Sequence, residues 1–242
     1  MLPVVILAGG LGTRLRDVTG DVMPKALVPV AGRPFLDHKL ADLAHAGVQD
    51  VLVLVGRHGS AIEEHVAKSE NFGLRVRCRS DGDRLLGTGG AVLAALPALP
   101  DAFWVTYGDT LLSFDVRDAE SAFTSGGRLG LMTVLRNRDR WETSNVDVRD
   151  GRVTRYDKGC APGTHEYLDY GMIALHANAF AGFDGSEPFD LGEVFAGLVE
   201  RGELTTYEVA DRFYDVGTVE RLRETESVVA AGRHVVGMVT PE

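Results

Sequence analysis

The sequence has little of the features that define several protein classes. It contains only two cysteines, Cys78 and Cys160, which lie far apart and form no CxxC or Cys/His ligand cluster. Such a pair predicts ordinary thiols in a reducing compartment rather than a disulfide framework or a zinc site. No apolar run approaches the roughly 20 residues that cross a bilayer. An apolar strand pattern already begins at Pro3, which leaves no room for the basic start of a signal peptide. We therefore expect a cytoplasmic protein without a membrane partner.

Basic residues are also scarce. Lys and Arg total 25 against 35 Asp and Glu, which gives a net charge of −10. This balance argues against nonspecific nucleic-acid binding, because such binding relies on a broad basic surface. It is compatible with a small phosphorylated ligand, since a local pocket can be basic on an acidic protein. The only lysines are Lys25, Lys39, Lys68 and Lys158, and two of them fall in the motifs described below.

The remaining composition is typical of a soluble globular protein, with 45% hydrophobic and 25% charged residues. In the first half of the chain, short apolar patterns typical of strands alternate with helical patterns. The predicted strands are Val4–Ala8, Val51–Val55, Leu74–Cys78 and Phe103–Tyr107, and the predicted helices include Phe35–Ala46 and Ala91–Leu96. This alternation predicts a mainly parallel sheet that is covered on both faces.

The second half of the chain has a different pattern. Asn145–Val148 and Val153–Tyr156 flank an Asp-Gly turn, which predicts a β-hairpin. Asp190 has the spacing of a helix start, and Thr218–Ala231 is predicted to be a final amphipathic helix. No linker-like run or internal repeat is present. We therefore predict a single α/β domain over residues 1–242, with a Rossmann-like mixed sheet that is mainly parallel.

A Gly-rich loop follows the first strand directly. The segment Leu7-Ala-Gly-Gly-Leu-Gly-Thr-Arg-Leu15 carries glycines that let a backbone approach a ligand and present N–H groups to phosphate. It does not fit the Walker A pattern, which needs Lys-Ser/Thr after a glycine, and it lacks the third glycine of the dinucleotide fingerprint. Ten residues after Arg14 comes Pro24-Lys-Ala-Leu-Val-Pro-Val30, in which the proline restrains the backbone next to Lys25.

These two segments together resemble the signature of the sugar-phosphate nucleotidyltransferase family. The resemblance covers nearly the whole chain and implies a GT-A-like fold. Further segments that resemble family motifs are Leu86-Gly-Thr-Gly-Gly-Ala91, Tyr107-Gly-Asp-Thr110, Tyr156-Asp-Lys-Gly159, Asp169-Tyr-Gly-Met172 and Tyr214-Asp-Val-Gly-Thr218. Two of them depart from the common pattern, since Asp157 stands where Glu is commoner and many relatives have Asn before the glycine-containing turn at residues 169–171.

The resemblance implies a role for each matched residue. The catalytic residues it implies are Arg14 and Lys25, as clamps on the β- and γ-phosphates. The implied nucleotide-binding residues are Leu7, Ala8, Gly9, Gly10, Gly12, Thr13, Asp81, Gly87 and Thr88. The implied sugar-phosphate-binding residues are Gly108, Lys158, Asp169, Tyr170 and Gly171. Asp109 and Asp215 are the implied metal ligands, and two carboxylates plus phosphate oxygens suit Mg²⁺.

The implied reaction is the attack of a sugar 1-phosphate oxygen on the α-phosphorus of a nucleoside triphosphate, with release of pyrophosphate. The attacking oxygen is already ionised, so catalysis needs positioning and charge neutralisation rather than a nucleophilic side chain. This expectation fits a chain that has no convincing Ser/His/Asp set. The partners we expect are therefore a nucleoside triphosphate and a sugar 1-phosphate, with Mg²⁺ as the cofactor and self-association as an open question.

Several alternatives stay open at this stage. The Gly-Thr-Gly-Gly-Ala loop favours a heptose-1-phosphate guanylyltransferase. Mannose-1-phosphate guanylyltransferases and N-acetylmuramate-1-phosphate uridylyltransferases are the other related groups. The short chain predicts a monofunctional enzyme without the β-helix acyltransferase domain of bifunctional relatives. Outside this class of enzyme stand a non-catalytic subunit that senses nucleotide sugars and a nicotinamide-dependent oxidoreductase.

Overall fold

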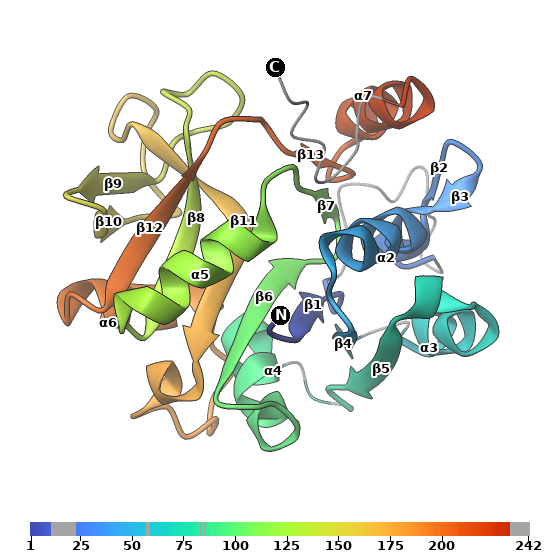
Figure 1. Cartoon of the computed structure of the whole chain (residues 1–242), viewed down its shortest axis with the longest axis horizontal. Helices are drawn as coiled ribbons and strands as arrows, with labels where there is room; N and C mark the ends of the chain where they lie inside the picture. The colour runs from blue at the N-terminus through green and yellow to red at the C-terminus, as the bar shows by residue number, and fades with distance from the viewer. Residues whose placement is uncertain (11–22, 57–58, 83, 85, 233–242) are drawn as a thin grey trace.

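The computed structural model describes residues 1–10, 23–56, 59–82, 84 and 86–232. Within them, one nine-stranded sheet has the order β5-β4-β1-β6-β11-β8-β12-β10-β9 (Figure 1). Its strands are β1 (Val4–Leu7), β4 (Asp50–Val55), β5 (Arg75–Ser80), β6 (Ala102–Tyr107), β8 (Gly130–Arg136), β9 (Val146–Arg149), β10 (Arg152–Tyr156), β11 (Tyr167–His176) and β12 (Leu204–Val209).

The sheet is mixed, and most of its strands point in one direction. Strands β5, β4, β1 and β6 are parallel neighbours, and so are β8 and β12. Strand β11 is antiparallel to both β6 and β8, so β8 runs in the same direction as β6. Strand β10 is antiparallel to β12 and β9. Only β11 and β10 therefore oppose the other strands of this sheet, which confirms the predicted α/β class with a mixed, mainly parallel sheet.

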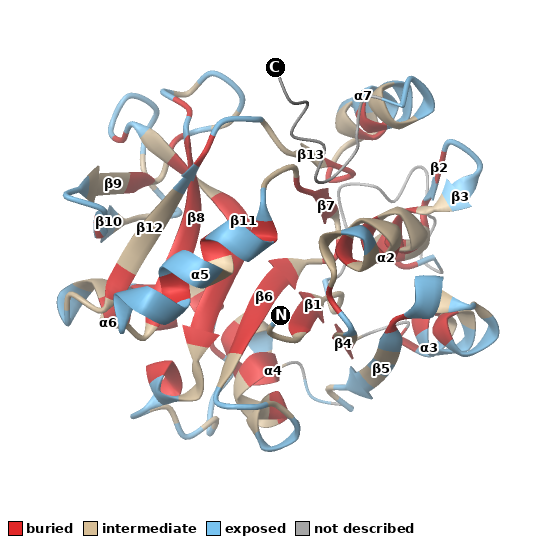
Figure 2. Cartoon of the chain, viewed as in Figure 1, coloured by how far each residue is buried: buried red, intermediate tan, exposed pale blue. Residues whose placement is uncertain are grey.

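Helices cover both faces of the sheet. Helices α2 (Phe35–Ala46), α3 (Gly59–Lys68) and α5 (Val116–Gly126) pack on one face, and α4 (Gly87–Ala95) and α6 (Leu191–Glu200) pack on the other. Each face therefore has its own hydrophobic core. Because successive side chains of a strand point to opposite faces, Trp104 lies in the core beneath α2, α3 and α5, and its neighbour Phe103 lies in the core beneath α4 and α6. Figure 2 shows this buried interior along β6, β8 and β11. No helix of the described residues is long and apolar enough to cross a bilayer.

A third, smaller core lies beside the main sheet. The short pairs β2 (Pro29–Val30) with β3 (Arg33–Pro34), and β7 (Thr110–Leu111) with β13 (Tyr214–Asp215), meet helix α7 (Val219–Ala230) there. Its buried residues are Val28, Val30, Phe35, Leu111, Val216 and Leu222. This packing brings the end of the chain's described part back to the loop that follows β6.

Two helices differ from the sequence-based expectation. Helix α5 was not predicted, although Val116, Ala119 and Phe123 recur at helical spacing and are its buried residues. Asp115 caps it by accepting hydrogen bonds from two backbone amides of the first turn. Helix α4 begins at Gly87 rather than at Ala91. The glycine-containing segment 87–90, which was expected to be a loop, therefore forms the first turn of this helix.

Candidate active site

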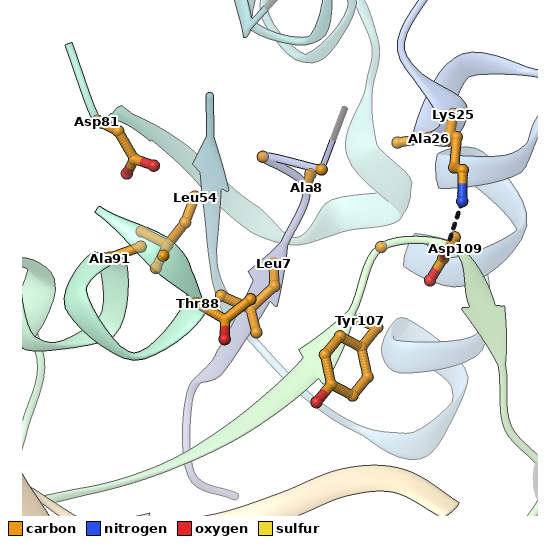
Figure 3. A pocket seen from close by; sticks show the side chains of 14 residues that line it. Leu7, Ala8, Lys25, Ala26, Leu54, Asp81, Thr88, Ala91, Tyr107 and Asp109 are labelled. Carbon is orange, nitrogen blue, oxygen red and sulfur yellow. Dashed lines mark hydrogen bonds and ion pairs between the residues drawn. The ribbon is translucent and has the colours of Figure 1, made fainter. Parts of the chain in front are cut away.

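A cavity of about 310 Å³ lies at the carboxyl ends of β1, β4, β5 and β6. This is the edge at which open α/β sheets commonly bind ligands. The cavity is lined by Leu7, Ala8, Gly9, Gly10, Lys25, Ala26, Leu54, Asp81, Gly87, Thr88, Ala91, Tyr107, Gly108 and Asp109. Asp81, Leu54 and Ala91 lie toward one end of this cavity, and Lys25 and Asp109 lie at the other (Figure 3).

The pairing of the strands explains why these residues meet. Leu7, the last residue of β1, is in register with Leu54 of β4 and with Tyr107 of β6. The loops that follow the three strands therefore leave the sheet side by side. The backbone of Gly108 lies so close to β1 that a Cβ atom there would be 3.0 Å from the carbonyl oxygen of Leu7. A larger residue at this position would push the two loops apart by a few tenths of an ångström.

Most of the predicted nucleotide-binding residues line this one cavity. They are Leu7, Ala8, Gly9, Gly10, Asp81, Gly87 and Thr88, and the predicted residues Lys25, Gly108 and Asp109 join them there. Gly12, Thr13 and Arg14 lie outside the described residues.

The end of the cavity that contains Lys25 and Asp109 holds an ion pair between these two residues. Lys25 lies in a short 3₁₀-helix directly after Pro24, whose extended backbone (φ −66°, ψ 143°) sets the direction of the chain. Its Nζ atom donates a hydrogen bond of 3.3 Å to Oδ2 of Asp109, and the Lys25 side chain is only 16% exposed. The predicted phosphate-binding lysine and the predicted metal ligand are thus direct neighbours.

Asp215 reaches the same region from the opposite end of the chain. In the β7–β13 pair it is in register with Thr110, and the amide of Val216 donates to the carbonyl of Asp109. Its carboxylate accepts hydrogen bonds from the backbone amide of Gly217 (2.6 Å) and from Arg221 (3.0 Å). Burial raises the pKa of Asp215 and the charge of Asp109 adds to this rise, although the amide of Gly217 and Arg221 oppose it.

The carboxylates of Asp109 and Asp215 are ligands of the type that suits a hard divalent cation, but only Asp109 lines the main cavity, and Asp215 lines a separate small recess with Arg221. Oxygen ligands are what Mg²⁺ prefers, and it usually keeps several waters and phosphate oxygens in its coordination shell. The described residues contain no group of three or more His, Cys, Asp or Glu side chains that could hold a metal ion.

A second group of predicted residues lies beside Tyr107. Asp169 accepts hydrogen bonds from the amide of Gly171 (3.0 Å) and from the hydroxyl of Tyr156 (3.4 Å). Burial raises the pKa of Asp169, and nearby Asp190 raises it further. Burial also raises the pKa of Tyr107, to which the charge of Asp169 contributes. Asp169, Gly171 and Tyr107 line one small recess, so this segment adjoins the main cavity through Tyr107.

Tyr170 does not belong to this group, because it lines neither the recess nor the main cavity. Its side chain is fully buried on the opposite face of the sheet. There it packs edge-on against Phe114 and Phe213, and its hydroxyl is hydrogen-bonded to the backbone of Ser113. The physical reason is the alternation of side chains along a strand, which sends Asp169 and Tyr170 to opposite faces.

Lys158 lies near the first turn of α4 rather than near Lys25. Its Nζ atom donates a 2.7 Å hydrogen bond to Oδ1 of Asp190, the residue that caps helix α6. The other oxygen of Asp190 accepts from the hydroxyl of Thr88 at 3.1 Å. The helix start predicted at Asp190 is present as a capping box over residues 190–193. Asp190 also contacts Thr88 and Lys158, which are both predicted substrate-binding residues.

Lys39 is a residue that the sequence reasoning missed. It lies on α2 and is 4% exposed, with hydrogen bonds from its Nζ to the carbonyl of Thr110 (2.7 Å) and to the hydroxyl of Thr106 (3.2 Å). The hydroxyl of Thr106 in turn donates to the carbonyl of Gly171. Lys39 thus holds the turn that carries Asp109 in place through its hydrogen bonds to Thr106 and Thr110. The only sequence signal was its place among the apolar positions of a helix, where a lysine is unusual.

Burial of Lys39 leads to a testable dependence of stability on pH. Desolvation lowers its pKa from 10.5 to about 8, although Asp42 and Asp109 oppose this effect. Between these two values the unfolded chain binds more protons at this position than the folded protein does. The free energy of unfolding of the wild type, minus that of Lys39→Met, should therefore increase with pH, by at most about 1.4 kcal/mol per pH unit.

Urea denaturation of both proteins from about pH 7 to about pH 10 measures this difference. The matched control is Lys68→Met, because Lys68 is 73% exposed and its difference from the wild type should not follow this trend. A Lys39→Met difference that stays constant over the whole range would contradict the prediction.

Comparison with known proteins agrees with this arrangement. Residues 3–231 match the nucleotidyl transferase family. The chain is 26% identical to D-glycero-alpha-D-manno-heptose 1-phosphate guanylyltransferase of Campylobacter jejuni, over 90% of this chain and 96% of that protein. It is 37% identical to the bifunctional protein GlmU of Pseudomonas entomophila, over 69% of this chain but only 33% of that longer protein.

A solved structure shares the fold over nearly the full length. HddC from Yersinia pseudotuberculosis, complexed with GMP-PN, superimposes with a TM-score of 0.81 at 26% identity, covering 95% of this chain and 100% of that one. The matched segment, residues 3–231, includes every strand of the sheet and every residue that lines the cavity. The chain therefore belongs to the nucleotidyl transferase family, among the enzymes that act on sugar 1-phosphates.

Proposed function

We propose that the protein transfers a guanylyl group from GTP to a neutral sugar 1-phosphate, such as a heptose or mannose 1-phosphate, with Mg²⁺ as the cofactor. The observation that carries the choice of base is the position of Asp81. This carboxylate lies toward the end of the cavity remote from Lys25 and Asp109 (Figure 3). Burial raises the pKa of Asp81, although the charge of nearby Arg79 opposes this rise.

Guanine is the base whose edge suits such a carboxylate. Its N1–H and 2-amino groups are adjacent donors, which a carboxylate accepts in a bidentate manner. Uracil and thymine present one N–H between two carbonyl oxygens, and those oxygens would face the negative charge. Two relatives support the same choice, since one is named a guanylyltransferase and the other was solved with GMP-PN, the name of a guanine nucleotide.

The acidic residues near Tyr107 support a neutral sugar. Asp169 and Asp190 lie near Tyr107. Both carboxylates interact electrostatically with the ammonium group of Lys158. A substrate phosphate already brings negative charge to this region. A further carboxylate on the sugar, as in N-acetylmuramate 1-phosphate, would be repelled, whereas neutral hydroxyl groups can donate hydrogen bonds to Asp169.

The residues of the chain then have these roles in the reaction. Lys25 neutralises the phosphates that leave as pyrophosphate, and Arg14 is proposed to share them. Lys158 binds the phosphate of the sugar substrate. Asp109 and Asp215 would hold Mg²⁺, which supplies positive charge to the α-phosphate and helps to align it with the attacking oxygen.

The identity of both substrates can be tested by pyrophosphate release from a panel of nucleoside triphosphates and sugar 1-phosphates. The wild type should prefer GTP to ITP, which lacks the 2-amino group, by roughly 10- to 100-fold in kcat/KM. Asp81→Asn should reduce the GTP/ITP ratio toward one, because an amide offers only one acceptor. Heptose and mannose 1-phosphates should outperform N-acetylmuramate 1-phosphate.

Comparison with ITP provides an internal control, since it shares the ribose and triphosphate of GTP. A defect of Asp81→Asn that is equal for GTP and ITP would remove Asp81 from base recognition. A wild-type preference for UTP would contradict the guanylyl assignment itself. A preference for N-acetylmuramate 1-phosphate would contradict only the proposal of a neutral sugar.

A further inference from the structure

The carboxylate of Asp190 connects three segments that are far apart in the sequence. Its Oδ1 atom accepts hydrogen bonds from Nζ of Lys158 (2.7 Å) and from the amide of Gly192 (2.7 Å), and its Oδ2 atom accepts from the hydroxyl of Thr88 (3.1 Å). Thr88 lies in the first turn of α4, Lys158 lies between β10 and β11, and Gly192 lies in the first turn of α6. One side chain therefore contacts a residue assigned to the nucleotide and another assigned to the sugar phosphate.

The backbone strengthens the link to the nucleotide side. The amide of Leu191 donates to the hydroxyl of Thr88 (2.8 Å), and the amide of Gly89 donates to the carbonyl of Phe189 (3.0 Å). The amide of Phe189 donates in turn to the carbonyl of Leu86 (3.1 Å). Gly87 has a φ of +75°, and a Cβ atom there would collide with the carbonyl of Phe189. The start of α4 and the segment before α6 are thus held together as one unit.

The link to the sugar side depends on charge. The side chains of Lys158 and Asp190 are 45% and 51% exposed, and an exposed ion pair of this kind contributes little to folding. Its consequence lies in position, because it places the ammonium group of Lys158 beside the first turn of α4. Within the described residues, Asp190 is the ion-pair partner found for Lys158.

We propose that Asp190 is a positioning residue that couples the two substrate subsites, so that binding of one substrate strengthens binding of the other. A nucleotide that contacts Thr88 would stabilise the hydrogen bond between Thr88 and Asp190, and Asp190 holds Lys158 where the sugar phosphate is proposed to bind. The coupling is reciprocal by thermodynamic necessity. This inference rests on the proposed assignment of Thr88 and Lys158 to the two substrates, and it does not depend on the identity of the base or the sugar.

Calorimetry without turnover tests the coupling. The probes are α,β-methylene-GTP, which cannot release pyrophosphate, and mannose 1-phosphate, both in the presence of Mg²⁺. In the wild type, the nucleotide analogue should lower the Kd of the sugar phosphate by roughly 5- to 20-fold. In Asp190→Asn this factor should fall below about 2-fold, because Asn caps a helix as well as Asp does but has no charge to hold Lys158.

The chain offers a matched control in Asp115→Asn. Asp115 caps helix α5 with the same chemistry and does not line the cavity. This variant should keep the wild-type coupling factor. Asp190→Ser is the second test variant, since Ser also caps helices but cannot reach Lys158. It should lose the coupling as Asp190→Asn does, and its melting temperature shows whether the fold is retained.

The outcomes separate this inference from the assignment of the site. If each probe binds the wild type by itself, then no coupling in the wild type, or equal coupling in the wild type and in Asp190→Asn, overturns the inference. A probe that does not bind by itself contradicts the proposed base or sugar, and the nucleotide analogue or sugar 1-phosphate selected by the substrate panel then takes its place in the same test. The single variants Thr88→Val and Lys158→Met test the assignment. If neither variant weakens the binding of its own ligand, the proposed subsites are wrong. If each does, and Asp190→Asn still retains full coupling, only the role of Asp190 is wrong.

Discussion

Replacement of Asp109 by Asn is expected to lower kcat by roughly 100-fold or more while the fold is retained. Asp109 follows β6 and lines the main cavity. In the β7–β13 pair, Asp215 is in register with Thr110, the residue after Asp109. An amide keeps the size of the carboxylate but removes its charge, so the affinity of the site for a divalent cation should fall. Asp215→Asn should have an effect of the same kind.

This expectation has a measurement that is independent of turnover. Binding of Mn²⁺, followed by electron paramagnetic resonance, should weaken in Asp109→Asn and in Asp215→Asn. EDTA should abolish the activity of the wild type, and added Mg²⁺ should restore it. Asp101→Asn is the matched control, because Asp101 is exposed at the opposite end of the same strand. Full activity in EDTA, or unchanged Mn²⁺ binding in both variants, would falsify the proposed cation site.

Lys25→Ala is expected to lower kcat by roughly 100-fold, with less than about a tenfold change in the Kd of the nucleotide. The Lys25 ammonium group lies at the Asp109 end of the cavity and is 16% exposed. If it neutralises the charge that develops on the departing pyrophosphate, it contributes more to the transition state than to the ground state. Lys25→Arg should rescue only part of the activity, because a planar guanidinium does not replace a compact ammonium.

The measurement combines steady-state kinetics with nucleotide binding by calorimetry. Lys68→Ala is the control for the loss of a lysine, since Lys68 is an exposed residue of α3 that pairs with Glu64. If Lys25→Ala weakens nucleotide binding and leaves kcat unchanged, Lys25 serves only to bind the substrate. A kcat defect that Lys25→Arg rescues completely would show that any positive charge is sufficient at this position.

The sequence by itself determined the features that depend on neighbouring residues. The strands of the first half, the hairpin of β9 and β10 and the capped start of α6 all follow from side-chain periodicity and local hydrogen bonds, which act over a few residues. The resemblance to the family motifs implied most of the residues that line the cavity. Its residues belong to short motifs at the ends of predicted parallel strands, and such ends meet at one edge of a sheet.

Tertiary structure decided what depends on contacts between distant residues. Lys39 meets the carbonyl of Thr110 only because α2 packs beneath the turn after β6. Asp190 meets Thr88, 102 residues away in the sequence, only because α4 and α6 cover the same face of the sheet. The motif around residue 170 did not reveal which of its side chains faces the recess beside Tyr107. That choice depends on how β11 is placed in the sheet, and the placement comes from burial of both faces, a property of the whole fold.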